Sequence, residues 1–98
     1  MNVVITDAAY SDMPGIGRFI VLDSPNRAET FVSELFESCR KLELMPGAYP
    51  LLPGREESRI RRKVHGNYLT FFRITDASVD ILHVLHGARD YDRILFAQ

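Results

Sequence analysis

The chain has 98 residues, of which 46% are hydrophobic, and a net charge of −1 at pH 7. This composition excludes a disordered chain, and no apolar run approaches the roughly 18 residues of a membrane span. The near-neutral charge argues against a strongly basic nucleic-acid binder. Because the chain has 98 residues, we expect one soluble domain over residues 1–98 with a single modest core.

The first element that the sequence predicts is a strand over residues 1–6, because Val3-Val4-Ile5 is a β-branched run. A helix should follow over residues 8–22, with Asp7 as its N-cap. The N-terminal residues show no basic region followed by a long apolar stretch, so we expect no secretory signal. One proline and two glycines weaken the middle of this helix and predict a kink or a late start: Pro14, Gly15 and Gly17.

A second helix should run from Pro25, its first residue, to about Leu44, with Ser24 as N-cap. Its apolar residues fall on one stripe, namely Ala28, Phe31, Val32, Leu35, Phe36, Cys39 and Leu42. The turn between the two helices is short, so they should form an antiparallel hairpin. Cys39 is the only cysteine and cannot form an internal disulfide, which fits a reducing compartment. We therefore expect a cytoplasmic protein in which Cys39 fills space as a small hydrophobe.

Three strands in an antiparallel meander should follow a proline-rich loop at residues 45–54, over residues 59–64, 68–74 and 79–86. A short helix or turn over residues 88–96 ends the chain. This β-α-α-β-β-β order predicts an α+β fold in which one helical hairpin packs on an antiparallel sheet. The expected core contains Phe31, Leu35, Phe36, Phe72 and Ile81.

Strict alternation along the last two strands makes both faces of the sheet apolar. One face would carry Tyr68, Thr70, Phe72 and Ile74 with Val79, Ile81, His83 and Leu85. The other face would carry Leu69, Phe71 and Arg73 with Leu82, Val84 and His86. A single helical hairpin covers only one face. We expect the C-terminal segment, another chain, or both to cover the second face, with the proline-rich loop as the alternative.

Four stretches taken together resemble the RelE/ParE toxins of type II toxin–antitoxin systems. They are GRFIVLDSPNRAETFVSELFESCRKL, YPLLPGREES, RIRRKVHGNYLTFFRI and VDILHVLHGARDYDRILF. The ending is more similar to the ParE, plasmid-stabilisation branch than to the RelE branch. The resemblance implies the fold described above, a cognate ParD-like antitoxin, and growth arrest by one of two routes. These routes are inhibition of DNA gyrase and ribosome-dependent cleavage of mRNA.

The nuclease route would use Arg62, His86 and Arg89 as its catalytic set, because the resemblance places a catalytic arginine at Arg89. Leu69, however, stands where RelE has an arginine, and the late tyrosine of the nuclease is missing from RILFAQ. His83 and His86 lie three residues apart on a predicted strand, so they should point to opposite faces. Without a β-bulge, two histidines so placed cannot act on one phosphate or hold one metal. We therefore prefer the gyrase inhibitor to the enzyme, and expect neither a metal nor a cofactor.

The segment REESRIRRK places five basic residues against two acidic ones. A basic zone beside an apolar sheet suits an acidic, amphipathic segment of an antitoxin that folds as it binds. The expected partner-binding residues are Arg59, Arg61, Arg62, Leu69, Phe71, Arg73, His86 and Arg89. For Arg89 the preferred interpretation is instead an ion pair with an acidic residue of the hairpin, while Asp90 should cap the terminal helix. We expect no membrane contact and no sequence-specific DNA binding by the toxin alone.

Overall fold

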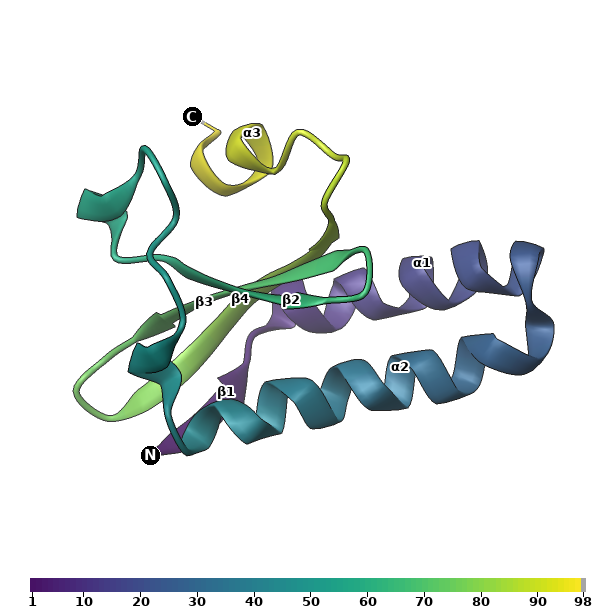
Figure 1. Cartoon of the computed structure of the whole chain (residues 1–98), viewed down its shortest axis with the longest axis horizontal. Coiled ribbons are helices and arrows are strands. Elements are labelled where there is room, and N and C mark those ends of the chain that lie inside the picture. Colours follow the sequence, from purple (N-terminus) through teal and green to yellow (C-terminus); the bar gives the residue numbers. More distant parts are fainter. Residues whose placement is uncertain (98) are drawn as a thin grey trace.

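The computed structural model describes residues 1–97, so Gln98, the last residue of the predicted domain, lies outside the described part. The elements are β1 (Asn2–Ile5), α1 (Asp7–Asp23), α2 (Pro25–Arg40), β2 (Arg61–His65), β3 (Tyr68–Ile74), β4 (Ser78–His86) and α3 (Tyr91–Phe96) (Figure 1). Three short 3-10 turns lie between α2 and β2, namely Lys41–Glu43, Pro46–Ala48 and Glu56–Ser58. No helix within residues 1–97 is long and apolar enough to cross a membrane.

Helix α1 begins where Thr6 caps it, because the Thr6 side chain accepts a hydrogen bond from the backbone N–H of Ala9 at 3.3 Å. The same hydroxyl donates to the carbonyl of Ile81 at 2.7 Å and ties the helix start to β4. The predicted cap at Asp7 is therefore wrong by one position. The helix continues past Pro14 to Asp23, so the expected late start does not occur either.

Helix α2 begins as the sequence predicts, with Ser24 at the N-cap position and Pro25 as the first helical residue. Within the described part of the chain the Ser24 side chain makes no capping hydrogen bond, so the start depends on the fixed backbone of Pro25. Figure 1 shows α1 and α2 running antiparallel on one side of the sheet, with their connection projecting beyond its edge.

The sheet has the strand order β1-β4-β3-β2. Strands β2, β3 and β4 form the expected antiparallel meander, whereas β1 pairs with β4 in parallel, so the sheet is mixed. The turn between β2 and β3 consists of Gly66 and Asn67, and Gly66 has a φ of 59°. Such a backbone conformation is the one that glycine adopts without strain.

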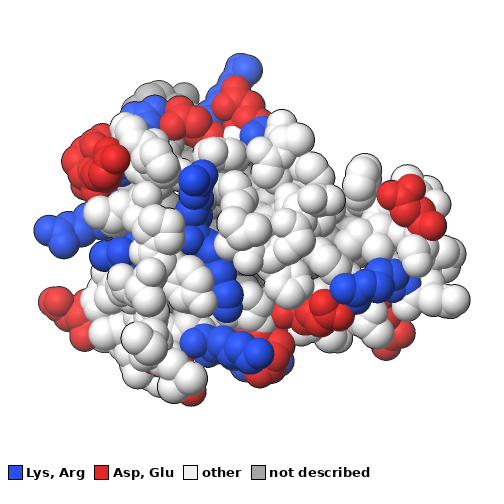
Figure 2. All heavy atoms as spheres, viewed as in Figure 1, with Lys and Arg blue, Asp and Glu red and all other residues white. Residues whose placement is uncertain are grey.

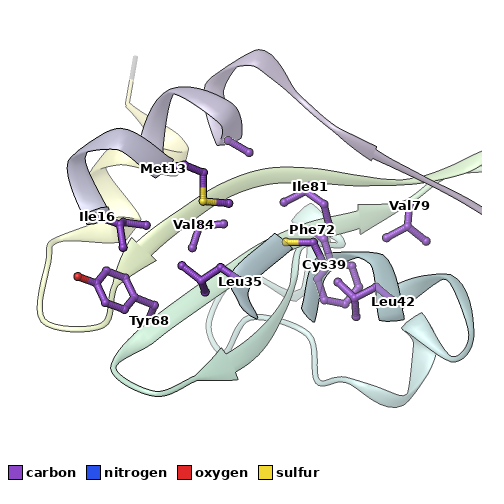
Figure 3. Packing of buried hydrophobic residues seen from close by; sticks show 11 residues of the cluster. Met13, Ile16, Leu35, Cys39, Leu42, Tyr68, Phe72, Val79, Ile81 and Val84 are labelled. Carbon is purple, nitrogen blue, oxygen red and sulfur yellow. The ribbon is translucent and has the colours of Figure 1, made fainter. Parts of the chain in front are cut away.

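The main core fills the space between the helical hairpin and the sheet (Figure 3). Met13 and Ile16 of α1, Leu35 of α2, and Phe72 and Ile81 of the sheet point into this space. The predicted burial of Leu35, Phe72 and Ile81 is confirmed, because each has 0% of its surface exposed. The other two predicted core residues are half-buried at the edge of this cluster: Phe31 and Phe36.

A second apolar cluster lies on the opposite face of the sheet, where Figure 1 shows α3. Its buried members are Leu52, Ile60, Leu69, Phe71 and Leu85, and α3 contributes the half-buried Tyr91, Ile94, Leu95 and Phe96. The second face is therefore covered by the C-terminal segment together with the loop before β2. Both of these covers were among the sequence-based expectations.

A β-bulge in β4 changes which side chains face the hairpin. Phe72 lies opposite Ile81 while Phe71 lies opposite His83, so Leu82 is the extra residue. Beyond the bulge, Val84 packs in the main core and Leu85 in the second cluster. The predicted faces of these two residues, based on strict alternation, are therefore wrong.

Candidate functional site

The basic run at β2 divides between the two faces of the sheet. Arg61 and Lys63 point toward the hairpin side, where Arg61 donates to the carbonyl of Tyr49 at 2.6 Å and Lys63 to that of Ser38 at 2.8 Å. Arg62 pairs with Phe71 and so lies on the α3 side. Arg61 is thus occupied in holding the proline-rich loop, and its expected role in partner binding requires that contact to break.

Two other predicted partner residues also differ from expectation. Arg59 does not belong to a strand, because it follows a 3-10 turn with φ of 63° and lies exposed before β2. Arg73 donates to the carbonyl of Ser58 at 3.1 Å and fixes the end of the same turn. Arg73 therefore holds the loop to the sheet.

Leu69 and Phe71 offer almost no surface to a partner. Phe71 is fully buried and its ring lies 5.0 Å from that of Tyr91, while Leu69 is 9% exposed. The sequence places them on an open face, but α3 and the preceding loop cover that face. Their expected direct contact with a partner is incompatible with this conformation.

The two histidines of β4 serve different local contacts. The Nδ1 atom of His83 lies 3.0 Å from a carboxylate oxygen of Asp12, and the same oxygen accepts the backbone N–H of Val84 at 2.8 Å. Asp12 thus accepts a hydrogen bond from a backbone N–H of β4 beyond the point where the pairing with β1 ends. His86 instead accepts the N–H of Ala88 through Nδ1 at 3.0 Å.

An open cleft of about 490 Å³ separates α1 from the ends of β3 and β4, and we call it the α1–β4 cleft. Its lining is largely apolar and comes from Ile16, Phe19, Tyr68, Val84 and Leu85, with Ser11, Asp12 and Gly15 along α1 and His86 and Arg89 at the strand end. The ring of His86 lies edge-on to Tyr68 and Phe19, with centroids at 5.2 and 6.4 Å. Phe19 is 57% exposed although it lies three residues after the buried Ile16, a spacing that places two residues on one helix face.

A second cleft, of about 300 Å³, lies between β2 and α3, and we call it the arginine cleft. It is lined by Leu52, Pro53, Arg62, Arg89, Asp90, Tyr91 and Asp92. Asp90 caps α3 as predicted, because its carboxylate accepts the N–H of Arg93 at 3.3 Å. Both oxygens of Asp92 accept hydrogen bonds from Arg55 at 2.9 Å, which lower the pKa of Asp92.

Both acidic residues of the arginine cleft are thus already engaged, whereas its two arginines are not. Within residues 1–97, neither Arg62 nor Arg89 makes a side-chain hydrogen bond or an ion pair. The preferred expectation for Arg89, an ion pair with the hairpin, is therefore wrong. Figure 2 shows basic side chains mainly over the sheet half of the molecule, beside a wide uncharged surface.

The candidate catalytic residues do not all lie together. Arg62 and Arg89 share the arginine cleft, but His86 lines the α1–β4 cleft, and Arg89 alone borders both. Two guanidinium groups can stabilise an anion, yet phosphodiester cleavage also needs a base and an acid at the same phosphate. Among residues 1–97, no histidine lines the arginine cleft. Among the described residues, no three His, Cys, Asp or Glu side chains gather as a metal site.

A helical hairpin on one face of a four-stranded sheet, with a short C-terminal helix on the other, is the fold of the RelE/ParE toxins. The family model of the ParE toxin of the type II toxin–antitoxin system parDE matches residues 3–91. This chain therefore belongs to the ParE toxin family. No curated protein matches the sequence.

Two solved structures share the fold at low sequence identity. A chain of the chromosomal ParDE toxin–antitoxin system from P. aeruginosa superposes with a TM-score of 0.76 at 19% identity, covering 88% of this chain and 95% of that one. A chain of the RelBE2 toxin–antitoxin complex from Mycobacterium tuberculosis superposes with a TM-score of 0.65 at 23% identity, covering 90% and 92%.

Proposed function

We propose that this protein is the toxin of a type II toxin–antitoxin system, that it arrests growth by inhibiting DNA gyrase, and that a cognate ParD-like antitoxin neutralises it in the cytoplasm. The observation that carries the proposal is the match of the ParE toxin family over residues 3–91, which includes the helical hairpin, β2, β3, β4 and all of β1 but Asn2. Both similar structures come from toxin–antitoxin systems, which supports the antitoxin as a partner.

The arrangement of the candidate site supports inhibition by binding over inhibition by cleavage. A gyrase inhibitor needs a shaped surface and no acid–base pair. His83 is held by Asp12, and His86 lies in a different cleft from Arg62. Leu69, at the position where the RelE resemblance would require an arginine, packs in the second cluster.

A RelE-like, ribosome-dependent endoribonuclease is the second candidate, and one observation favours it. Arg62 and Arg89 line one cleft together with Tyr91, so two cations and a phenol could meet one phosphate. The similarity in fold to a chain of the RelBE2 complex is consistent with this candidate. It would use Arg62, Arg89 and Tyr91, with His86 reaching the site only after a rearrangement.

Expression of the toxin without its antitoxin in a bacterial host separates the two candidates. Gyrase inhibition should produce double-strand DNA breaks and an SOS response while mRNA stays intact, whereas the nuclease would cleave mRNA within minutes. A variant that tests the histidine is His86→Ala, because His86 lines the α1–β4 cleft and not the arginine cleft. Cleavage of mRNA by the parent would establish the enzyme instead, and its loss in a stably folded His86→Ala protein would add His86 to the catalytic set.

A further inference from the structure

The α1–β4 cleft has the properties of a site for a large apolar side chain. Its volume of about 490 Å³ falls within the roughly 300–1,000 Å³ of ligand-binding pockets. Phe19 forms a wall that is 57% exposed, and Leu22, one turn further along α1, is 82% exposed. A Cβ atom at Gly15 would lie 3.9 Å from the guanidinium of Arg18, which is an ordinary van der Waals contact, so there is space beside this wall. Exposed aromatic surface beside a cleft is a typical anchor point for a protein partner.

The arginine cleft has the properties of a site for a carboxylate. Arg62 and Arg89 carry like charges, and within residues 1–97 no acidic side chain pairs with either. The two acids in the lining cannot compensate them, because Asp92 is paired with Arg55 and Asp90 caps α3. A guanidinium can donate two parallel hydrogen bonds to one carboxylate. A carboxylate bound between the two arginines would also reduce the repulsion between their positive charges.

The two clefts adjoin at Arg89, which lines both. A single segment can therefore fill the apolar cleft and reach the arginines without leaving the surface. Nucleic acid fits this surface poorly, because a surface that binds a nucleic-acid backbone presents several unpaired basic side chains to successive phosphates. Arg55, Arg61, Lys63 and Arg73 are all engaged within the chain, and the net charge is −1.

We propose that one segment of the antitoxin lies across both clefts, with a large apolar side chain against Phe19 and an aspartate or glutamate between Arg62 and Arg89. The inference rests on the proposed toxin function and names the residues through which the partner is recognised. The apolar contact supplies most of the affinity, while the carboxylate fixes the register of the segment and speeds association.

The test is a binding titration of the antitoxin encoded by the adjoining reading frame. Arg62→Gln/Arg89→Gln should weaken binding by about 30-fold or more at low salt, and by less as salt rises. The matched control is Arg40→Gln/Lys41→Gln, which removes the same charge from exposed residues outside both clefts and should change affinity by less than about threefold. Phe19→Ala should weaken binding by about tenfold or more, against no change for Leu44→Ala, which truncates a still more exposed apolar residue outside both clefts.

Unchanged affinity of the Arg62→Gln/Arg89→Gln protein, with tight binding by the parent, would overturn the docking site and leave the toxin proposal standing. No binding by the parent would overturn both.

A labelled RNA or DNA oligonucleotide serves as the competing probe. If the parent bound it and the double variant did not, while the antitoxin bound both proteins equally, the ligand of the arginines would be a phosphodiester and not a carboxylate. Because all substituted side chains are largely at the surface, equal thermal stability of the variants confirms that folding is intact.

Discussion

Truncation of Phe71 to alanine tests whether the second face of the sheet is closed within this chain. Phe71 has 0% of its surface exposed and lies among Leu52, Ile60, Leu69 and Leu85, with the ring of Tyr91 at 5.0 Å. Removing such a ring from a packed site costs about 3–5 kcal/mol in the free energy of unfolding. A domain of this size is stable by roughly 5–15 kcal/mol in total, so the loss would be a large fraction. At about 4–8 °C per kcal/mol, the melting temperature should fall by roughly 12–40 °C.

The assay is urea denaturation followed by circular dichroism, with the melting temperature as a second readout. Phe71→Leu keeps part of the contacts and should cost on the order of 1 kcal/mol, so it remains measurable if Phe71→Ala does not fold. The control is Val64→Ala on β2, where the side chain is 64% exposed and the change should stay within about 0.5 kcal/mol. A loss below about 1 kcal/mol for Phe71→Ala would refute the packing of α3 on this face and return Phe71 to the partner surface.

Three further predictions concern single side chains. Ser38→Ala should stabilise the protein by about 1 kcal/mol in denaturant titrations, because the Ser38 hydroxyl is buried without a hydrogen-bond partner among residues 1–97; a loss of similar size would show that a bond exists. Cys39 should resist a thiol reagent at pH 8 until the protein unfolds, since burial raises the pKa of its thiol; rapid modification of the folded protein would contradict the placement of α2. Asp92→Asn should accelerate amide hydrogen exchange in α3 at pH 7, because the hydrogen bonds of Arg55 lower the pKa of Asp92 and stabilise the ionised form. That difference should vanish as the pH falls through the lowered pKa, where the parent carboxyl also becomes neutral, and a difference that persisted there would show that the ion pair is not its cause.

Local sequence signals predict most of the elements correctly. Pro25 marks the start of α2, Asp90 caps α3, and Gly66 occupies the left-handed position of the β2–β3 turn. Each of these signals acts through the backbone of the residue itself or of a residue within three positions. Short-range chemistry of this kind can be read from one sequence.

The β-bulge at Leu82 cannot be predicted from such local signals. Its position depends on the partner strand and on Asp12, whose carboxylate accepts a hydrogen bond from the backbone N–H of Val84, 72 positions away in the sequence. Strict alternation therefore assigns Val84 and Leu85 to the wrong faces. No residue in the segment itself distinguishes a bulged strand from a regular one.

The candidate site is predictable in composition but not in arrangement. Arg62 and Arg89 were both expected in partner contacts, and they line one cleft. Arg61 and Arg73 look equivalent to Arg62 in the sequence, yet loop carbonyls 12 and 15 positions away take up their donors. Phe19 has core spacing but stays exposed, consistent with the hairpin extending beyond the sheet in Figure 1.

The proposed function is tested most directly by titrating the purified toxin into a supercoiling reaction with DNA gyrase and relaxed plasmid. We predict that supercoiling is inhibited, that cleaved plasmid accumulates when the reaction is stopped with detergent and protease, and that stoichiometric antitoxin reverses both effects. Full gyrase activity at an excess of folded toxin, together with cleaved mRNA when the same protein is added to translating ribosomes, would contradict gyrase inhibition and identify a ribosome-dependent nuclease.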